Sequence, residues 1–314
     1  FFVILTWFFL FPPEELPQNL EESENITDVS DVNDLIPPTI DSISNESTDT
    51  VADSVSNQTA PRIKIETPKL SGSISLLGGR IDDLSLKTYF ETLEKQNNVS
   101  FLVPSNEDNA YYVLYGWSPA DDKLTKDDVP GPTTLWELEK GKNITVDSPI
   151  ILKWDNKNGL IFRRKLSIDE DFMFSVEQSV ENNTNNSYKL SPYGIIARHS
   201  KPDVIGFFIL HEGFISMTDG ILEEIKYDEC WLCTEIEDFE FDTREKGHTQ
   251  KLEVEKNGWV GFTDKYWMTA LIPQPGTEFT SVAKYKPRSD IYLTESRLKI
   301  LKVGPGSSEV VSTQ

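Results

Sequence analysis

From residue 62 onwards, apolar and polar residues alternate in short runs. The clearest run, DFMFSVEQSVEN at residues 171–182, places Phe172, Phe174, Val176 and Val180 on one parity and mainly polar side chains on the other. Because successive side chains of a strand point to opposite faces, this run predicts a strand with one wet face. Similar runs predict further strands at residues 62–66, 70–77, 110–117, 150–154, 159–168, 188–199, 206–212, 259–263, 266–272, 279–285 and 299–303.

The arrangement of these runs indicates the fold class. Gly, Pro and Asn–Asn pairs separate them, and no long stretch has the period of an amphipathic helix. Over about 250 residues we expect fourteen strands or more, with too few helices for the crossovers of a parallel sheet. The sequence therefore predicts an all-β domain over residues 62–314, built as a large antiparallel sandwich or two packed sheets.

The first eleven residues, FFVILTWFFLF, are uncharged, and ten of them are apolar. A bilayer-spanning helix needs about 20 such residues, so this segment is too short to span alone. We interpret residues 1–11 as the C-terminal part of a first transmembrane helix, with Trp7 near the membrane interface. The alternative is a short buried strand or core segment.

Residues 12–61 have a different composition, with twelve acidic residues and no Lys, Arg, Phe, Tyr or Trp. Such a segment buries too little apolar surface to order itself, so it predicts a disordered acidic linker. It carries more than half of the chain's net charge of −22 and leaves −10 on the rest. Because cytoplasmic flanks collect Lys and Arg, this flank indicates the exported side, which in a bacterium is the periplasm.

The overall charge and the common motifs exclude several functions. A net charge of −22 with a pI near 4.5 leaves no basic face for nucleic acid. The sequence contains no nucleophile elbow, zinc-protease motif, Walker loop or dinucleotide-binding glycine motif. The paired acids at residues 82–83, 121–122 and 127–128 are interpreted as turn residues. Trp259, Phe262, Tyr266 and Trp267 are interpreted as core packing and not as a binding patch.

Two constellations could carry chemistry. Cys230 and Cys233 have redox-motif spacing, but their acidic surroundings raise thiol pKa, which favours a disulfide or two unreactive thiols. His199, His211 and Glu212 lie at the ends of neighbouring predicted strands and could form a general acid–base set like that of aldose epimerases of the galactose mutarotase type, so the alternative function is such an epimerase or a mutarotase-like carbohydrate-binding protein. That hypothesis requires the three to converge in one open pocket. Otherwise they are polar strand-end residues.

Four segments resemble the periplasmic domain of the YidC family of bacterial membrane protein insertases, and alphaproteobacterial members most closely. They cover most of residues 62–314, and the order of helix end, acidic linker and β domain also matches the family. The segments are TPKLSGSISLLGGRIDDLSLKTY (67–89), SPYGIIARH (191–199), FFILHEG (207–213) and NGWVGFTDKYWMTALIP (257–273).

The resemblance implies a β-super-sandwich, the fold of the galactose mutarotases, in a domain on the periplasmic side of the inner membrane. It implies no enzymatic activity, no cofactor and no catalytic, cofactor-binding or metal-binding residue in this chain. The complete protein would insert and help fold nascent inner-membrane proteins, alone or with the Sec translocon, and this domain would be a scaffold that contacts SecD/SecF. The chain is then expected to end at Gln314 within the domain's last strand, before the helices that hold the insertion groove.

Overall fold

The computed structural model describes residues 60–202, 211–227, 240–242 and 247–314. The chain divides into two units, residues 1–33 and 34–314, and every described residue belongs to the second. The predicted helix end, nearly all of the acidic linker, and Cys230 with Cys233 therefore lie outside the described residues. Within the described ranges, no helix is both long and apolar enough to cross a membrane.

The largest sheet has eleven strands. Its main order is β1-β2-β3-β5-β10-β18-β17-β14-β13, with β4 paired to β3 and β19 paired to β10, and all its ladders are antiparallel. The strands are β1 (Arg62–Glu66), β2 (Leu70–Ser75), β3 (Arg80–Phe90), β4 (Asn98–Leu102), β5 (Tyr111–Pro119), β10 (Tyr188–His199), β13 (Glu240–Asp242), β14 (Gly247–Val254), β17 (Phe279–Lys286), β18 (Ile291–Leu298) and β19 (Leu301–Val303).

Two smaller antiparallel sheets complete the described fold. One has the order β12-β11-β15-β16 and the other β20-β9-β8-β7-β6. The first contains β11 (Gly213–Thr218), β12 (Ile221–Lys226), β15 (Gly258–Thr263) and β16 (Met268–Leu271). The second contains β6 (Glu137–Lys140), β7 (Ile150–Asp155), β8 (Leu160–Ile168), β9 (Phe174–Asn182) and β20 (Ser308–Thr313). The helical content of the described ranges is one short 3-10 turn, η2 (Lys126–Asp128).

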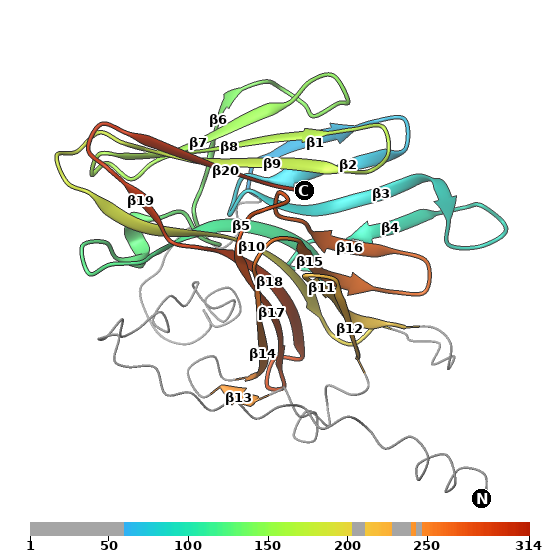
Figure 1. The fold of residues 1–314 in the computed structure, drawn as a ribbon. Helices are drawn as coiled ribbons and strands as arrows, with labels where there is room; N and C mark the ends of the chain where they lie inside the picture. The colour runs from blue at the N-terminus through green and yellow to red at the C-terminus, as the bar shows by residue number, and fades with distance from the viewer. Residues whose placement is uncertain (1–59, 203–210, 228–239, 243–246) are drawn as a thin grey trace, which may run out of the picture. The chain divides into compact units, whose positions relative to one another are not determined.

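The sheets enclose a common apolar core, to which each contributes alternate residues. Leu84 of the largest sheet, Phe162 of the five-stranded sheet and Phe262 of the four-stranded sheet are all nearly inaccessible and belong to one buried cluster. Figure 1 shows the five-stranded sheet above β5 and β10 of the largest sheet, and the four-stranded sheet to the right of β18 and β17. The predicted one-sided strand is confirmed, because Val176, Gln178 and Val180 of β9 are buried while Glu177 and Ser179, on the other parity, are partly exposed.

A buried cation links two of the sheets. Arg164 of β8 is completely inaccessible, and its guanidinium donates to the carbonyls of Gly78, Gly79 and Tyr115. It also stacks 4.5 Å from the ring centroid of Trp136. Burial lowers the pKa of Arg164 to about 10, so the side chain stays charged at neutral pH. Gly79 has φ +60, and a Cβ there would lie 2.5 Å from the guanidinium, so this position suits glycine.

One prediction about paired acids is wrong. Asp82 and Asp83 lie inside strand β3 and not in a turn. Arg62 of β1 reaches across β2 to bind the carboxylate of Asp82, and the hydroxyl of Ser73 donates to Asp83. Burial raises the pKa of Asp82, and Arg62 opposes that shift. The turn interpretation failed because it took no account of a cation from another strand.

Some of the predicted strands coincide with strands of the structure, and others do not. The predicted ranges 62–66 and 188–199 coincide with β1 and β10, whereas β18 was not predicted. The central residues of β18, Thr294, Glu295 and Ser296, are polar and yet buried, and the guanidinium of Arg297 donates to Glu295. The predicted strand 206–212 lies mainly outside the described residues, and β11 begins just after it at Gly213.

Candidate functional site

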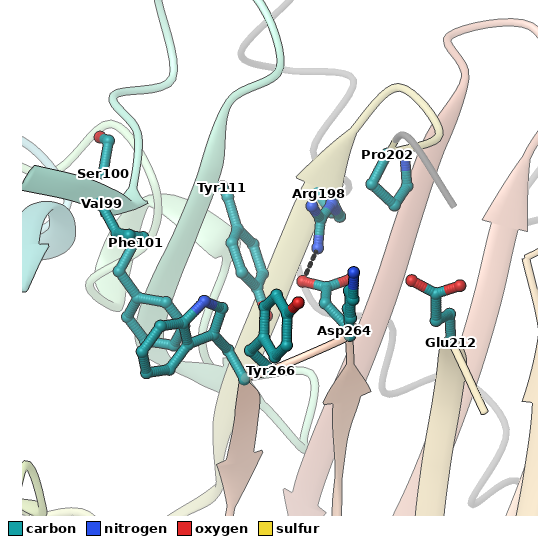
Figure 2. A pocket seen from close by; sticks show the side chains of 11 residues that line it. Val99, Ser100, Phe101, Tyr111, Arg198, Pro202, Glu212, Asp264 and Tyr266 are labelled. Carbon is teal, nitrogen blue, oxygen red and sulfur yellow. Dashed lines mark hydrogen bonds and ion pairs between the residues drawn. The ribbon is translucent and has the colours of Figure 1, made fainter. Parts of the chain in front are cut away.

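The candidate site is a half-open cleft of about 280 Å³ where the largest sheet meets the turn between β15 and β16 (Figure 2). Strand β4, the start of β5 and the end of β10 form one side, and the turn that follows β15 forms the other. Its lining residues are Val99, Ser100, Phe101, Tyr111, Arg198, Pro202, Glu212, Asp264, Lys265, Tyr266 and Trp267.

An ion pair forms the polar part of the cleft. The guanidinium of Arg198 donates to Oδ2 of Asp264, and these side chains are only 16% and 22% exposed. Burial opposes the charge of Arg198, but neighbouring groups, including Asp264, outweigh that effect and raise its pKa. The guanidinium also lies 4.7 Å from the ring centroid of Tyr111. Oδ1 of Asp264 is buried and has no hydrogen-bond partner among the described residues.

Aromatic rings form the apolar wall. Trp267 packs edge-on against Tyr89 at 4.7 Å and against Phe101 at 6.1 Å between ring centroids. Phe101 in turn contacts the ring of Tyr111 at 6.2 Å. Burial raises the pKa of Tyr111, so its phenol is neutral at physiological pH. The cleft therefore combines rigid aromatic surfaces with one internally paired charge couple.

The prediction that Tyr266 is a core residue is wrong, since this residue is 70% exposed at the cleft. It lies in the turn between β15 and β16, where no second sheet covers the side chain. Phe262, on β15 itself, is fully buried as predicted, and Trp267 packs partly against the core. The aromatic run thus divides between the core and the cleft.

The structure separates the predicted acid–base residues. Glu212 lines the cleft, but His199 and His211 are not among its lining residues in the described part of the chain. Adjacent strand residues point to opposite faces, so His199 lies on the other face of β10 from Arg198 and contacts the Tyr112 hydroxyl at 3.3 Å. His211 donates through Nε2 to the carbonyl of Phe214. The convergence that sugar chemistry requires is not present.

The remaining chemistry of the cleft favours binding. The formal charges of Arg198, Lys265, Glu212 and Asp264 cancel. Among the described residues, no group of three His, Cys, Asp or Glu side chains is placed to hold a metal ion. The sequence interpretation missed Arg198 and Asp264 as site residues, although both lie at the ends of predicted strands, a position that often carries function.

Comparison with known proteins identifies the family. A model of the YidC periplasmic domain matches residues 62–314, which include nearly all of the described fold. The chain belongs to the YidC family of membrane protein insertases. It is 50% identical to the YidC of Dinoroseobacter shibae and 47% identical to that of a Jannaschia species, with all of this chain covered in both alignments. The matched regions are 51% and 50% of those proteins, so the chain spans about half the length of these relatives.

The family assignment also places the β domain on the periplasmic side of the inner membrane, as the sequence predicted. A galactose mutarotase-related enzyme from Lactobacillus acidophilus superimposes with a TM-score of 0.50 at 10% identity, covering 81% of this chain and 96% of that one. The predicted all-β, mutarotase-like super-sandwich is therefore confirmed. At this level of identity, the likeness concerns the fold alone.

Proposed function

We propose that this chain is the periplasmic part of an insertase that inserts inner-membrane proteins and assists their folding, alone or with the Sec translocon. The observation that carries the proposal is the match of the YidC periplasmic domain to residues 62–314, together with 50% identity to a YidC insertase over the whole chain. Nascent inner-membrane proteins are the substrates and SecD/SecF the neighbouring partners in this proposal.

The described domain acts in this proposal as a docking module without catalysis. Insertion moves polypeptide between water and lipid, and hydrophobic transfer supplies its driving force without bond chemistry. A periplasmic domain can contribute by holding exported segments near the insertion site. The aromatic cleft supports such a role, because Tyr266 and Trp267 offer large surfaces that lose little side-chain entropy on binding.

The insertase part of the proposal is tested by genetic rescue. Cells depleted of their own insertase receive the complete gene that encodes this chain, and insertion of an inner-membrane protein is followed by protease accessibility. Restored insertion is the expected result. A complete protein that reaches the membrane at normal abundance and restores nothing would refute the insertase assignment.

The docking part needs a separate experiment. A photo-crosslinking amino acid replaces Tyr266 in the cleft or, as a matched control, Val310, which is 60% exposed on β20. Position 266 should form adducts with exported segments of nascent inner-membrane proteins, and position 310 should form few. Equal adduct yields at the two positions would show that the cleft has no docking role, even where rescue succeeds.

A further inference from the structure

The edge of strand β4 borders the aromatic cleft. Val99, Ser100 and Phe101 are consecutive residues, and all three line it. The pairing of β4 with β3 shifts in register here, because Ser85 pairs with Ser100 and Leu84 with Leu102, so Phe101 is a bulged residue. In the described sheets β4 pairs with β3 alone, and the backbone groups on its other edge are directed away from that partner.

The charges on the edge strands distinguish this edge from others. Strands at sheet edges commonly carry charged side chains that prevent another chain from pairing with them. In the described part of the fold, this protection is present on most edge strands, namely β1 (RIKIE), β6 (ELEK), β12 (ILEEIK), β13 (EFD), β19 (LKV) and β20 (SEVVST). It is missing from β4 (NVSFL) and β16 (MTAL).

The two edge strands without charged residues, β4 and β16, lie close to each other. Trp267 immediately precedes β16, and its ring contacts Phe101 of β4 and Tyr89 of β3. Figure 1 shows β4 and β16 next to each other on the same side of the domain. Both strands pair on one side only in the sheet order, with β3 and β15 respectively. Charge protection is thus absent at the place where the aromatic cleft opens.

We propose that an extended, uncharged polypeptide segment adds as a strand to the β4 edge inside this cleft. Backbone hydrogen bonds to β4 supply affinity, and the rings of Tyr266 and Trp267 receive alternate apolar side chains of the segment. The absence of net charge among Arg198, Lys265, Glu212 and Asp264 matches a segment that carries no charge.

This inference rests on the docking role proposed above and specifies what docks and how. Exported segments of inner-membrane proteins fit this edge better than cytoplasmic segments do, because the excess of Lys and Arg lies in cytoplasmic loops. An added strand is recognised through its backbone hydrogen bonds and its alternate side chains, without an exact sequence. This mode of recognition suits a site that receives many different substrates.

The test uses the complete protein that contains this chain, reconstituted in lipid nanodiscs, and the capped heptapeptide acetyl-TVTFTVT-amide. Two further peptides have the same sequence but carry N-methyl groups on alternate residues, one at the odd and one at the even positions, so that each loses the hydrogen bonds of one edge and retains its side chains. The unmodified peptide should bind and slow hydrogen exchange at alternate amides of β4, and the two N-methylated peptides should differ in affinity. Equal binding of the unmodified and both N-methylated peptides, unchanged exchange at β4, or no binding would overturn the proposal.

Substitutions provide an independent readout. Tyr266→Ala should weaken peptide binding about tenfold, the ratio that corresponds to about 1.4 kcal/mol. Val310→Ala, on the exposed face of β20, should leave binding unchanged. Peptide binding with failed rescue would refute the insertase assignment and retain the strand-addition site. Successful rescue without exchange protection at β4 would support the insertase assignment and refute the strand-addition site.

Discussion

The indole of Trp267 packs edge-on against the ring of Tyr89, with 4.7 Å between the ring centroids. Trp267 precedes β16 of the four-stranded sheet, whereas Tyr89 lies near the end of β3 in the largest sheet. The contact therefore joins two sheets at the mouth of the cleft. Phe101 and Tyr111 continue the ring contacts inward, so this pair also supports the wall against which we expect a ligand to pack.

The contact between the rings of Tyr89 and Trp267 should contribute measurably to the stability of the fold. Edge-to-face pairs contribute about 0.5–1.5 kcal/mol beyond the area they bury. We expect Tyr89→Ala and Trp267→Ala to show a coupling energy in that range in a double-mutant cycle measured by urea unfolding. Strictly additive effects would show that the two sheets are not coupled through these rings. Tyr89→Ala with Val310→Ala is the matched pair, and it should be additive because Val310, an exposed residue of β20, takes no part in the ring contact between Tyr89 and Trp267.

The ion pair in the cleft should also be coupled. Arg198→Met leaves the carboxylate of Asp264 poorly exposed and without its cation, which should lower the free energy of unfolding by about 3 kcal/mol. Adding Asp264→Asn removes the unpaired charge, so the double variant should be more stable than the sum of the single effects predicts. Chemical denaturation of the four proteins measures this. A double variant as unstable as that sum would contradict the pairing.

Arg164 and Arg163 are adjacent on β8 but should respond differently to substitution. Arg164→Met removes the donors to three carbonyls, and we expect a loss of about 3 kcal/mol or more. Arg163 binds Glu139 and Glu181 at a more exposed position, so Arg163→Met should cost at most about 1 kcal/mol. Urea unfolding of the two variants compares the same substitution at adjacent positions. Similar losses would contradict the structural role assigned to Arg164.

His199 should make stability depend on pH. Burial, followed by the positive charge of Arg80, lowers its pKa below the ordinary value of 6.5. As pH falls below 6.5, the unfolded chain binds the proton more readily than the folded chain, so stability decreases until pH reaches the lowered folded pKa. Urea unfolding at about pH 7.5 and about pH 5.5 should show a larger loss for the wild type than for His199→Gln. An equal loss would mean that His199 does not contribute, since the other titrating groups are common to both proteins.

The strands that could be predicted are those whose stability depends on a simple alternation. Strand β9 has an apolar and a polar parity, and its burial follows that pattern. Strand β18 could not be recognised in this way, because Glu295 is buried with Arg297 as its partner. Strand β3 was missed for a similar reason, since the cation that accompanies Asp82 comes from β1. Local patterns do not show partners supplied by other strands.

The sequence by itself determined the all-β class and the family, because period-two alternation is a local property and the matching segments are continuous. The tertiary structure decided which polar and aromatic residues meet. Arg198 comes from β10 and Phe101 from β4, whereas Asp264 and Trp267 come from the turn between β15 and β16. The order of the strands brings these three elements to one cleft. The tertiary structure also separated His199 from Glu212. Arg198 faces the cleft that Glu212 lines, and His199, the next residue of β10, faces the opposite side and contacts Tyr112.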